Sequence, residues 1–164
     1  MGHIFRLAEH SDVNTVFQLY KKRIQWMNEN GIRQWNVTGY LDVYPVDYYP
    51  RHQTLGNLYV LEENNSIIGA VVLLQEDGRW SEKTNQPAFY VHKLVADTRV
   101  SGAGKEILLE VEKIARQRGK RFVRLDCAVD NRFLNHYYSS LGYKTAGTCQ
   151  EGTYIGNRRE KALI

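Results

Sequence analysis

Two closely spaced glycines, Gly102 and Gly104, separate a run of residues typical of a strand from a run typical of a helix. The first N–H groups of a helix lack intrahelical partners, and the helix dipole adds partial positive charge there. Glycine also lets a ligand approach the backbone closely. The turn is therefore a candidate site for a phosphate or pyrophosphate group, although glycines that serve turn geometry alone would give the same pattern.

The elements on either side of this turn can be read from the residue pattern. Residues 89–97 (FYVHKLVAD) are apolar, β-branched and aromatic, as expected of a buried strand. After the turn, apolar residues recur at helical spacing, and Gly119 supplies a stop. These apolar residues are Ile107, Leu108, Val111, Ile114 and Ala115. The sequence thus predicts a strand, a tight glycine turn and a helix whose first N–H groups face the turn.

The two cysteines, Cys127 and Cys149, do not form a C-x-x-C pair or a disulfide framework. We interpret them as free thiols in a reducing, cytoplasmic compartment. Cys127 lies within an apolar run, so we expect a buried, unreactive thiol rather than an acyl-enzyme nucleophile. The spacing of histidines and cysteines predicts no metal site.

Charge and composition narrow the class of partner. The chain of 164 residues carries a net charge of +4, with 43% hydrophobic and 24% charged residues, which is ordinary for a globular domain. A basic protein suits an anionic partner, either a phosphorylated cofactor or nucleic acid. No RNA-binding aromatic motif or Lys/Arg-rich tract is present, so nucleic acid is not favoured. No apolar run approaches the roughly 20 residues of a membrane span.

The remaining elements follow from periodicity and turn residues. We expect a first strand at 3–8, then an amphipathic helix from 12 to about 29 that Ser11 or Asp12 could cap. We expect the aromatic-rich residues 32–51 to form a loop and a short helix near 46–54. Strands at 57–63 and 66–75 flank an Asn64-Asn65 turn, and 76–86 is a polar turn. A strand at 121–129, a helix at 132–141 that Asp130 or Asn131 could cap, and two closing strands complete a mixed sheet with helices on both faces.

In this order of elements the chain resembles the GCN5-related N-acetyltransferase (GNAT) superfamily, over nearly its whole length. The acetyl-CoA signature [Q/R]-x-x-G-x-[G/A] is met by Arg99-Val100-Ser101-Gly102-Ala103-Gly104. A second signature is met by Asn131 and by Tyr138-Ser-Ser-Leu-Gly142-Tyr143. Where the family often has a proline before the loop, this chain has Asp97 and Thr98. The resemblance implies an α+β fold with a mixed, predominantly antiparallel sheet, and a single N-acetyltransferase domain over 1–164.

The resemblance implies that the cofactor is acetyl-CoA and that no metal is needed. The pantetheine arm is expected against backbone groups near Leu94, Val95 and Ala96, between the 89–97 strand and the one after it. The pyrophosphate is expected on the amides of residues 100–105. These residues are Val100, Ser101, Gly102, Ala103, Gly104 and Lys105. Arg99 and Lys105 could add charge or be ordinary solvated cations, and Asn131 could contact the cofactor, cap its helix, or do both.

The implied reaction is direct attack of a neutral amine on the thioester, which needs an acid for the leaving thiolate and a route for the amine's proton. Tyr138 matches the family's acid, and we prefer it over Tyr137, which points about 100° away on a helix. For the base, three candidates remain open: His92 on the 89–97 strand, Glu76 at a strand end, and a water chain.

The acceptor is expected among the first two helices, their connection and the final hairpin. Trp35 and Tyr40 are the substrate-binding candidates there, together with other aromatics of that region, namely Trp26, Tyr44, Tyr48 and Tyr49. Such rings could bracket an amine by cation–π contact or could pack in the core. The leading hypothesis is acetylation of a small-molecule or peptide amine, and the alternative is a non-catalytic acyl-CoA-binding module. The oligomeric state is not readable from the sequence, although homodimers are common among proteins that resemble it.

Overall fold

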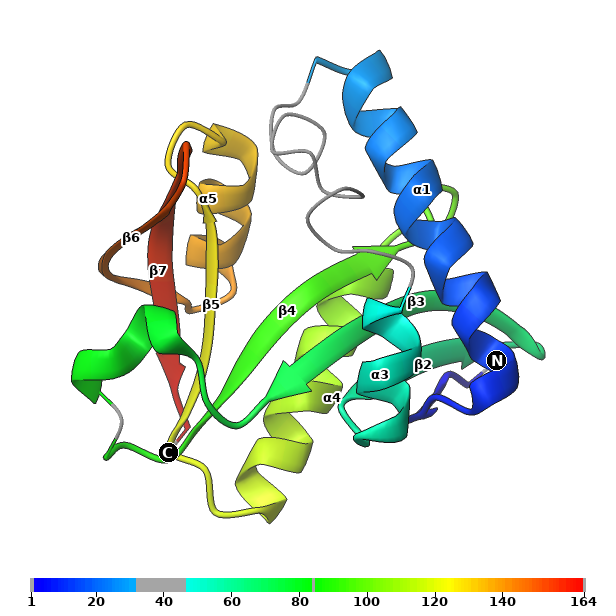
Figure 1. Ribbon diagram of the computed structural model, residues 1–164, viewed down its shortest axis with the longest axis horizontal. Coiled ribbons are helices and arrows are strands. Elements are labelled where there is room, and N and C mark those ends of the chain that lie inside the picture. The colour runs from blue at the N-terminus through cyan, green and yellow to red at the C-terminus, as the bar shows by residue number, and fades with distance from the viewer. Residues whose placement is uncertain (1, 32–46, 84, 164) are drawn as a thin grey trace. The chain divides into compact units, whose positions relative to one another are not determined.

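A computed structural model describes residues 2–31, 47–83 and 85–163 of the chain. The chain divides into two compact units (Figure 1). The N-terminal unit comprises Met1–Leu73 and His92–Glu110, and the C-terminal unit comprises Leu74–Val91 and Val111–Ile164. Strand β4 (Ala88–Ala96) and helix α4 (Ala103–Gln117) each contribute residues to both units.

In the N-terminal unit, strands β1 (Ile4–Leu7), β2 (Leu58–Glu63) and β3 (Ser66–Leu74) pair antiparallel in that order, and β3 neighbours β4. The turn between β2 and β3 is made by Asn64 and Asn65, whose φ angles are 50° and 66°. Positive φ at both central residues is the requirement of a type I′ two-residue hairpin turn, and asparagine tolerates it. The Asn-Asn pair therefore sets the hairpin as the sequence predicted.

Helices cover both faces of these strands (Figure 1). Helix α1 (Val13–Glu29) and helix α3 (Tyr48–Thr54) lie on one face, and the first turns of α4 lie on the other, where Ile107 packs against Gly69 of β3. Between α1 and α3, Tyr20 and Tyr49 are fully buried and their rings stack at 4.8 Å. Aromatic residues of this region thus include core members, as the packing interpretation expected.

The prediction that Ser11 or Asp12 caps the first helix was wrong. The Asp12 carboxylate instead accepts the N–H of Glu9 at 2.8 Å and pairs with Arg6 at 2.7 Å. These contacts organise a short 3-10 turn (His10–Asp12) ahead of α1, and neither Ser11 nor Asp12 caps α1 with its side chain. A tertiary partner on β1 therefore outcompeted the local capping contact.

In the C-terminal unit, β4 pairs parallel with β5 (Phe122–Ala128), through residues 88–90 and 122–124. Strand β7 (Tyr154–Ala162) pairs antiparallel with β5 and with β6 (Lys144–Glu151), which gives the order β4-β5-β7-β6. Helix α5 (Arg132–Ser140) connects β5 to β6. The pairs β1–β2, β2–β3, β5–β7 and β6–β7 are antiparallel and β4–β5 is parallel, which confirms the α+β class with a mixed, predominantly antiparallel sheet.

The prediction of a polar turn at residues 76–86 also needs correction. Residues Gly78–Lys83 contain two short 3-10 turns separated by a kink at Trp80, whose backbone is not helical and whose side chain is fully buried. The guanidinium groups of Arg124 and Arg158 lie over the indole at 5.0 and 4.8 Å, and Arg158 donates to the carbonyl of Arg79 at 2.9 Å. One aromatic ring against two buried arginines holds this segment to the unit. No helix in the described part of the chain is long and apolar enough to cross a bilayer.

Candidate functional site

The predicted anion site is built by the turn between β4 and α4, within the N-terminal unit. Gly102 has a φ of +82°, a conformation that L side chains rarely adopt, and nothing lies within 4 Å of the position that a Cβ would take. The first helical hydrogen bond of α4 runs from the N–H of Glu106 to the carbonyl of Gly102, at 3.1 Å. The N–H groups of Ala103, Gly104 and Lys105 therefore belong to the first turn, which has no intrahelical acceptors.

Asp97 fixes the shape of this turn. Its own N–H donates to the carbonyl of Ile68 at 2.8 Å, and its carboxylate accepts the N–H of Arg99 at 2.9 Å. The N–H of Val100 donates to the Asp97 carbonyl at 3.0 Å. Arg99 and Val100 use their N–H groups in hydrogen bonds inside the turn. The set of backbone N–H groups expected to bind a pyrophosphate, the cradle, therefore narrows from residues 100–105 to residues 101–105.

The Arg99 side chain is committed to the same aspartate. Its guanidinium donates to both carboxylate oxygens, from Nε at 3.0 Å and from Nη2 at 2.8 Å, while the side chain stays 79% exposed. This pairing lowers the pKa of Asp97 to about 2 and raises that of Arg99. Asp97 thus orders the turn and neutralises part of the charge of Arg99.

Strand β4 carries a local distortion next to the predicted base. Lys93, between His92 and Leu94, has a φ of +54°, which is unusual for a non-glycine residue and costs on the order of 1–3 kcal/mol. Such strain persists only where the surrounding structure enforces it, and it clusters at functional sites. His92, Leu94 and Ala96 are half-buried and Val95 is buried, so the residues expected along the pantetheine arm lie together on the end of this strand.

A second histidine, which sequence reasoning missed, lies in the same unit. His52 of α3 has its Nδ1 at 3.0 Å from Asn57 Nδ2, and its ring meets Tyr48 edge-on at 4.4 Å. Burial lowers the pKa of His52, and the charges of Arg51, His92 and Lys93 lower it further. His52 is therefore neutral at physiological pH. The predicted helix at 46–54 includes His52, but only the packing of α3 brings its ring near the charges of His92 and Lys93 on β4.

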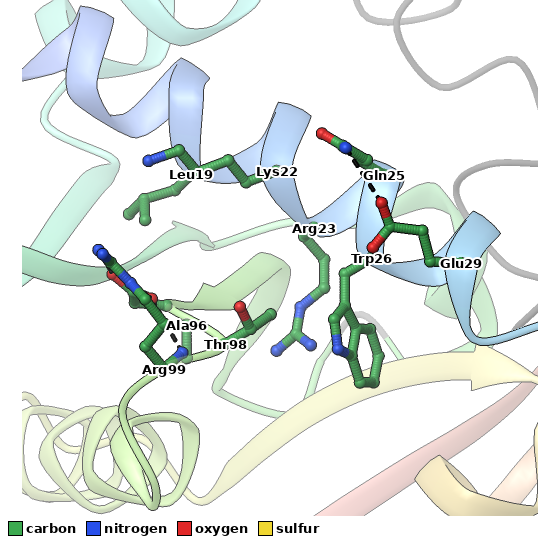
Figure 2. Close-up of a pocket in the computed structure, with 10 residues that line it drawn as sticks. Leu19, Lys22, Arg23, Gln25, Trp26, Glu29, Ala96, Thr98 and Arg99 are labelled. Atoms are coloured by element: carbon green, nitrogen blue, oxygen red, sulfur yellow. Dashed lines mark hydrogen bonds and ion pairs between the residues drawn. The ribbon is translucent and has the colours of Figure 1, made fainter.

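Between α1 and the β4–α4 turn the N-terminal unit contains a pocket of about 300 Å³ (Figure 2). Its lining includes Leu19, Arg23 and Trp26 from α1, and Ala96 and Thr98 from the turn. Figure 2 shows the Arg23 side chain extending into the space between Thr98 and Trp26. The Arg23 guanidinium lies over the Trp26 ring, at 4.8 Å from its centroid.

Helix α5, in the C-terminal unit, positions the predicted acid. Asn131 caps it, accepting the N–H of Leu134 at 3.0 Å. Tyr138 is buried, with its ring edge-on to Tyr143 at 6.2 Å. Tyr137 stacks instead on Phe133, which is 70% exposed, so the two neighbouring tyrosines face different environments, as helical geometry requires.

The expectation of an unreactive cysteine agrees with the geometry. Cys127 is fully buried, and burial raises the pKa of its thiol to about 11. Among the described residues, no group of three or more His, Cys, Asp or Glu side chains could hold a metal ion.

Comparison with known proteins decides the family. The acetyltransferase (GNAT) family matches residues 25–143, which is more than half of the chain. The chain belongs to the GNAT family. This confirms the resemblance drawn from the two motifs, both of which lie within the matched residues.

Individual relatives are distant in sequence but similar in fold to this GNAT protein. The uncharacterized N-acetyltransferase YesJ of Bacillus subtilis (strain 168) is 23% identical over 155 residues, covering 90% of this chain and 85% of YesJ. A GNAT acetyltransferase structure from Listeria monocytogenes 4b F2365 is 22% identical, with a TM-score of 0.82 and coverage of 98% and 95%. The PaiA N-acetyltransferase of Thermoplasma acidophilum, solved with coenzyme A, is 18% identical, with a TM-score of 0.74 and coverage of 99% of both chains.

The other predicted residues of this GNAT protein are distributed as follows. The cofactor candidates from Leu94 to Lys105 and His92 belong to the N-terminal unit, while Asn131 and Tyr138 belong to the C-terminal unit. Trp35 and Tyr40 lie outside the described residues. Glu76 is exposed, in the segment before Trp80.

Proposed function

We propose that this GNAT protein transfers the acetyl group of acetyl-CoA to a primary amine of a small molecule or peptide. The observation that carries the proposal is the β4–α4 turn, where Gly102, directly before α4, has positive φ and nothing within 4 Å of its Cβ position. Backbone donors at a helix N-terminus suit a pyrophosphate. The presence of coenzyme A in the Thermoplasma PaiA structure supports the same ligand for this chain.

The residues of the N-terminal unit fit this cofactor. Residues 101–105 would hold the pyrophosphate through their N–H groups, with Lys105 adding charge. Asp97 would act earlier, by ordering the turn before the ligand arrives, so that less conformational entropy is lost on binding. The end of β4 at Leu94, Val95 and Ala96 would present backbone groups to the pantetheine arm.

The bound acetyl-CoA supplies a thioester carbon open to attack. A neutral amine would form the new C–N bond as the C–S bond breaks, and the O–H of Tyr138 would donate a proton to the departing sulfur. The amine's proton leaves through His92 or through water.

The catalytic role is tested by measuring CoA release across a panel of amines. Tyr138→Phe should lower kcat by about 100-fold or more and leave the dissociation constant for acetyl-CoA unchanged. Tyr137→Phe, which removes the neighbouring hydroxyl, should change kcat little. Tight acetyl-CoA binding without turnover, indifferent to Tyr138→Phe, would instead identify a non-catalytic acyl-CoA-binding module and refute the proposal.

The cofactor site is tested with two glycines that share one kind of backbone strain. Gly102 and Gly119 both have positive φ, +82° and +71°, and both have open space where a Cβ would go. Alanine at either position should therefore destabilise the fold by a similar amount. Only Gly102→Ala should weaken acetyl-CoA binding, and equal affinities of the two variants would contradict the assignment of the turn.

A further inference from the structure

Tyr143, in the C-terminal unit, is held by its backbone and by its hydroxyl. Its N–H donates to the carbonyl of Tyr138 at 3.0 Å, and its own carbonyl accepts from Nη1 of Arg159 at 2.9 Å. The hydroxyl donates to Oε2 of Glu112 at 2.8 Å, and the whole residue is buried. Burial and the charge of Glu112 raise the pKa of Tyr143 far above neutral, so the hydroxyl stays a donor. These contacts fix one rotamer, and with it the plane of the ring.

Glu112 of α4 is a buried acid whose charge is balanced within the same unit. It is only 3% exposed, and a buried carboxylate without partners is costly. Its Oε2 accepts the Tyr143 hydroxyl, and its Oε1 accepts the Lys161 ammonium at 3.0 Å. The Lys161 side chain passes close to Gly142, with its Cε at 3.3 Å from the position that a Cβ would take. The missing side chain at Gly142 thus leaves room for the cation that balances Glu112.

The ring of Tyr143 packs in turn against Tyr138, the proposed acid. The two rings meet edge-on with 6.2 Å between their centroids, an arrangement typical of stabilising aromatic pairs. The ring of Tyr137 also meets Tyr138 edge-on, at 5.5 Å. Tyr137 is half-buried and stacks on the exposed Phe133, whereas Tyr143 is buried and bound to Glu112. Of these two rings, Tyr143 is the one that the core of the unit holds in place.

We infer that Glu112 is a positioning residue for Tyr138 and acts through Tyr143. A general acid has to lie within hydrogen-bond reach of the atom that it protonates, and a displacement of about 1 Å can cost on the order of 100-fold in rate. Hydrogen bonds behind a catalytic group lock its rotamer and supply this precision. The inference rests on the proposed function, because the group that Glu112 supports is the acid of that reaction.

The inference is tested by breaking the hydrogen bond between Tyr143 and Glu112 and measuring kcat per folded molecule. Tyr143→Phe keeps the ring and should lower kcat by about tenfold, part of what a full ångström costs, with an unchanged dissociation constant for acetyl-CoA. Glu112→Leu should have the same effect, whereas Glu112→Gln, which keeps an oxygen as acceptor, should retain most of kcat. Tyr90→Phe is the matched control, because it removes another buried tyrosine hydroxyl from a charged partner in this unit, Nη1 of Arg124 at 3.1 Å. It should lower stability and leave kcat unchanged.

A double-variant cycle separates positioning from general damage to the fold. If Tyr143 acts through the acid, Tyr143→Phe should lower kcat in the wild-type background and have no further effect in the Tyr138→Phe background. A loss of equal size in both backgrounds, or an equal loss in Tyr90→Phe, would overturn the inference. A lowered kcat in Tyr138→Phe with an unchanged kcat in Tyr143→Phe would reject the positioning and keep the proposed function.

A readout without turnover tests the positioning independently of the reaction. The ring signals of Tyr138 in the NMR spectrum, assigned with Tyr138→Phe, should shift in both Tyr143→Phe and Glu112→Leu and should stay in place in Tyr90→Phe. Signals that do not respond to Glu112→Leu would show that the carboxylate does not set the position of this ring. An inactive protein whose Tyr138 signals respond as expected would lose the proposed function and keep the link from Glu112 to Tyr138.

Discussion

Gly69 on β3 lies close to Ile107 of α4 in the N-terminal unit. A Cβ at this position would lie 2.6 Å from Cδ1 of Ile107 and 3.0 Å from the carbonyl oxygen of Val95. Ordinary contacts between carbon atoms are about 3.5–4.0 Å. Its φ lies outside the left-handed range, so alanine would be excluded by space alone.

The expected cost of Gly69→Ala follows from two opposing effects. Overpacking a core costs about 1–3 kcal/mol, whereas alanine in place of glycine in a strand returns about 0.5–1 kcal/mol. The net destabilisation should be about 0–2.5 kcal/mol, or a fall in Tm of up to about 10 °C for a chain of this length. Urea denaturation measures the free energy directly. Gly78→Ala is the control, because Gly78 also lacks positive φ and has no atom within 4 Å of its Cβ position.

Ile107→Val shows whether the clash is with that side chain. Alone, it removes Cδ1 and should cost about 0.5–1.5 kcal/mol. Combined with Gly69→Ala, it removes the 2.6 Å contact, so the double variant should be more stable than the sum of the two single costs predicts. The contact with the Val95 carbonyl remains, so the rescue should be incomplete. Additivity to within about 0.5 kcal/mol would show that the two residues do not compete for this space, and the packing argument would fail.

Three further predictions concern the C-terminal unit. Asn131→Ala should lower the free energy of unfolding by about 1 kcal/mol through loss of the cap on Leu134, whereas Asn131→Asp should retain it in urea denaturation. Tyr143→Phe should cost about 1–3 kcal/mol, because the buried Glu112 carboxylate loses a 2.8 Å hydrogen bond, and a change below about 0.5 kcal/mol would contradict this. The thiol of Cys127, with a pKa of about 11, should resist alkylation by iodoacetamide near neutral pH in the native protein, and the rate should rise as pH approaches that value. Rapid labelling of Cys127 at neutral pH, read by mass spectrometry, would show that burial does not protect it.

Local residue patterns were sufficient for most elements and for the family. The Asn64-Asn65 turn, the apolar face of α4, the cap at Asn131 and the stop at Gly119 each depend on backbone preferences of a few neighbouring residues, so a single sequence reveals them. The glycine turn belongs to the same class, because Gly102 meets a conformational requirement that its neighbours cannot. The acetyltransferase family and the α+β fold were both predicted from such patterns and were confirmed.

Tertiary structure alone decided which side chains meet. Asp12 left its expected capping role because Arg6 lies within reach, and Trp80 is buried because two arginines from β5 and β7 cover it. Arg23 and Trp26 lie one helical turn apart in sequence, but only the packing of α1 near the β4–α4 turn makes them line the same pocket as Thr98. Contacts between distant segments depend on how helices pack on the sheet, and no local preference encodes that packing.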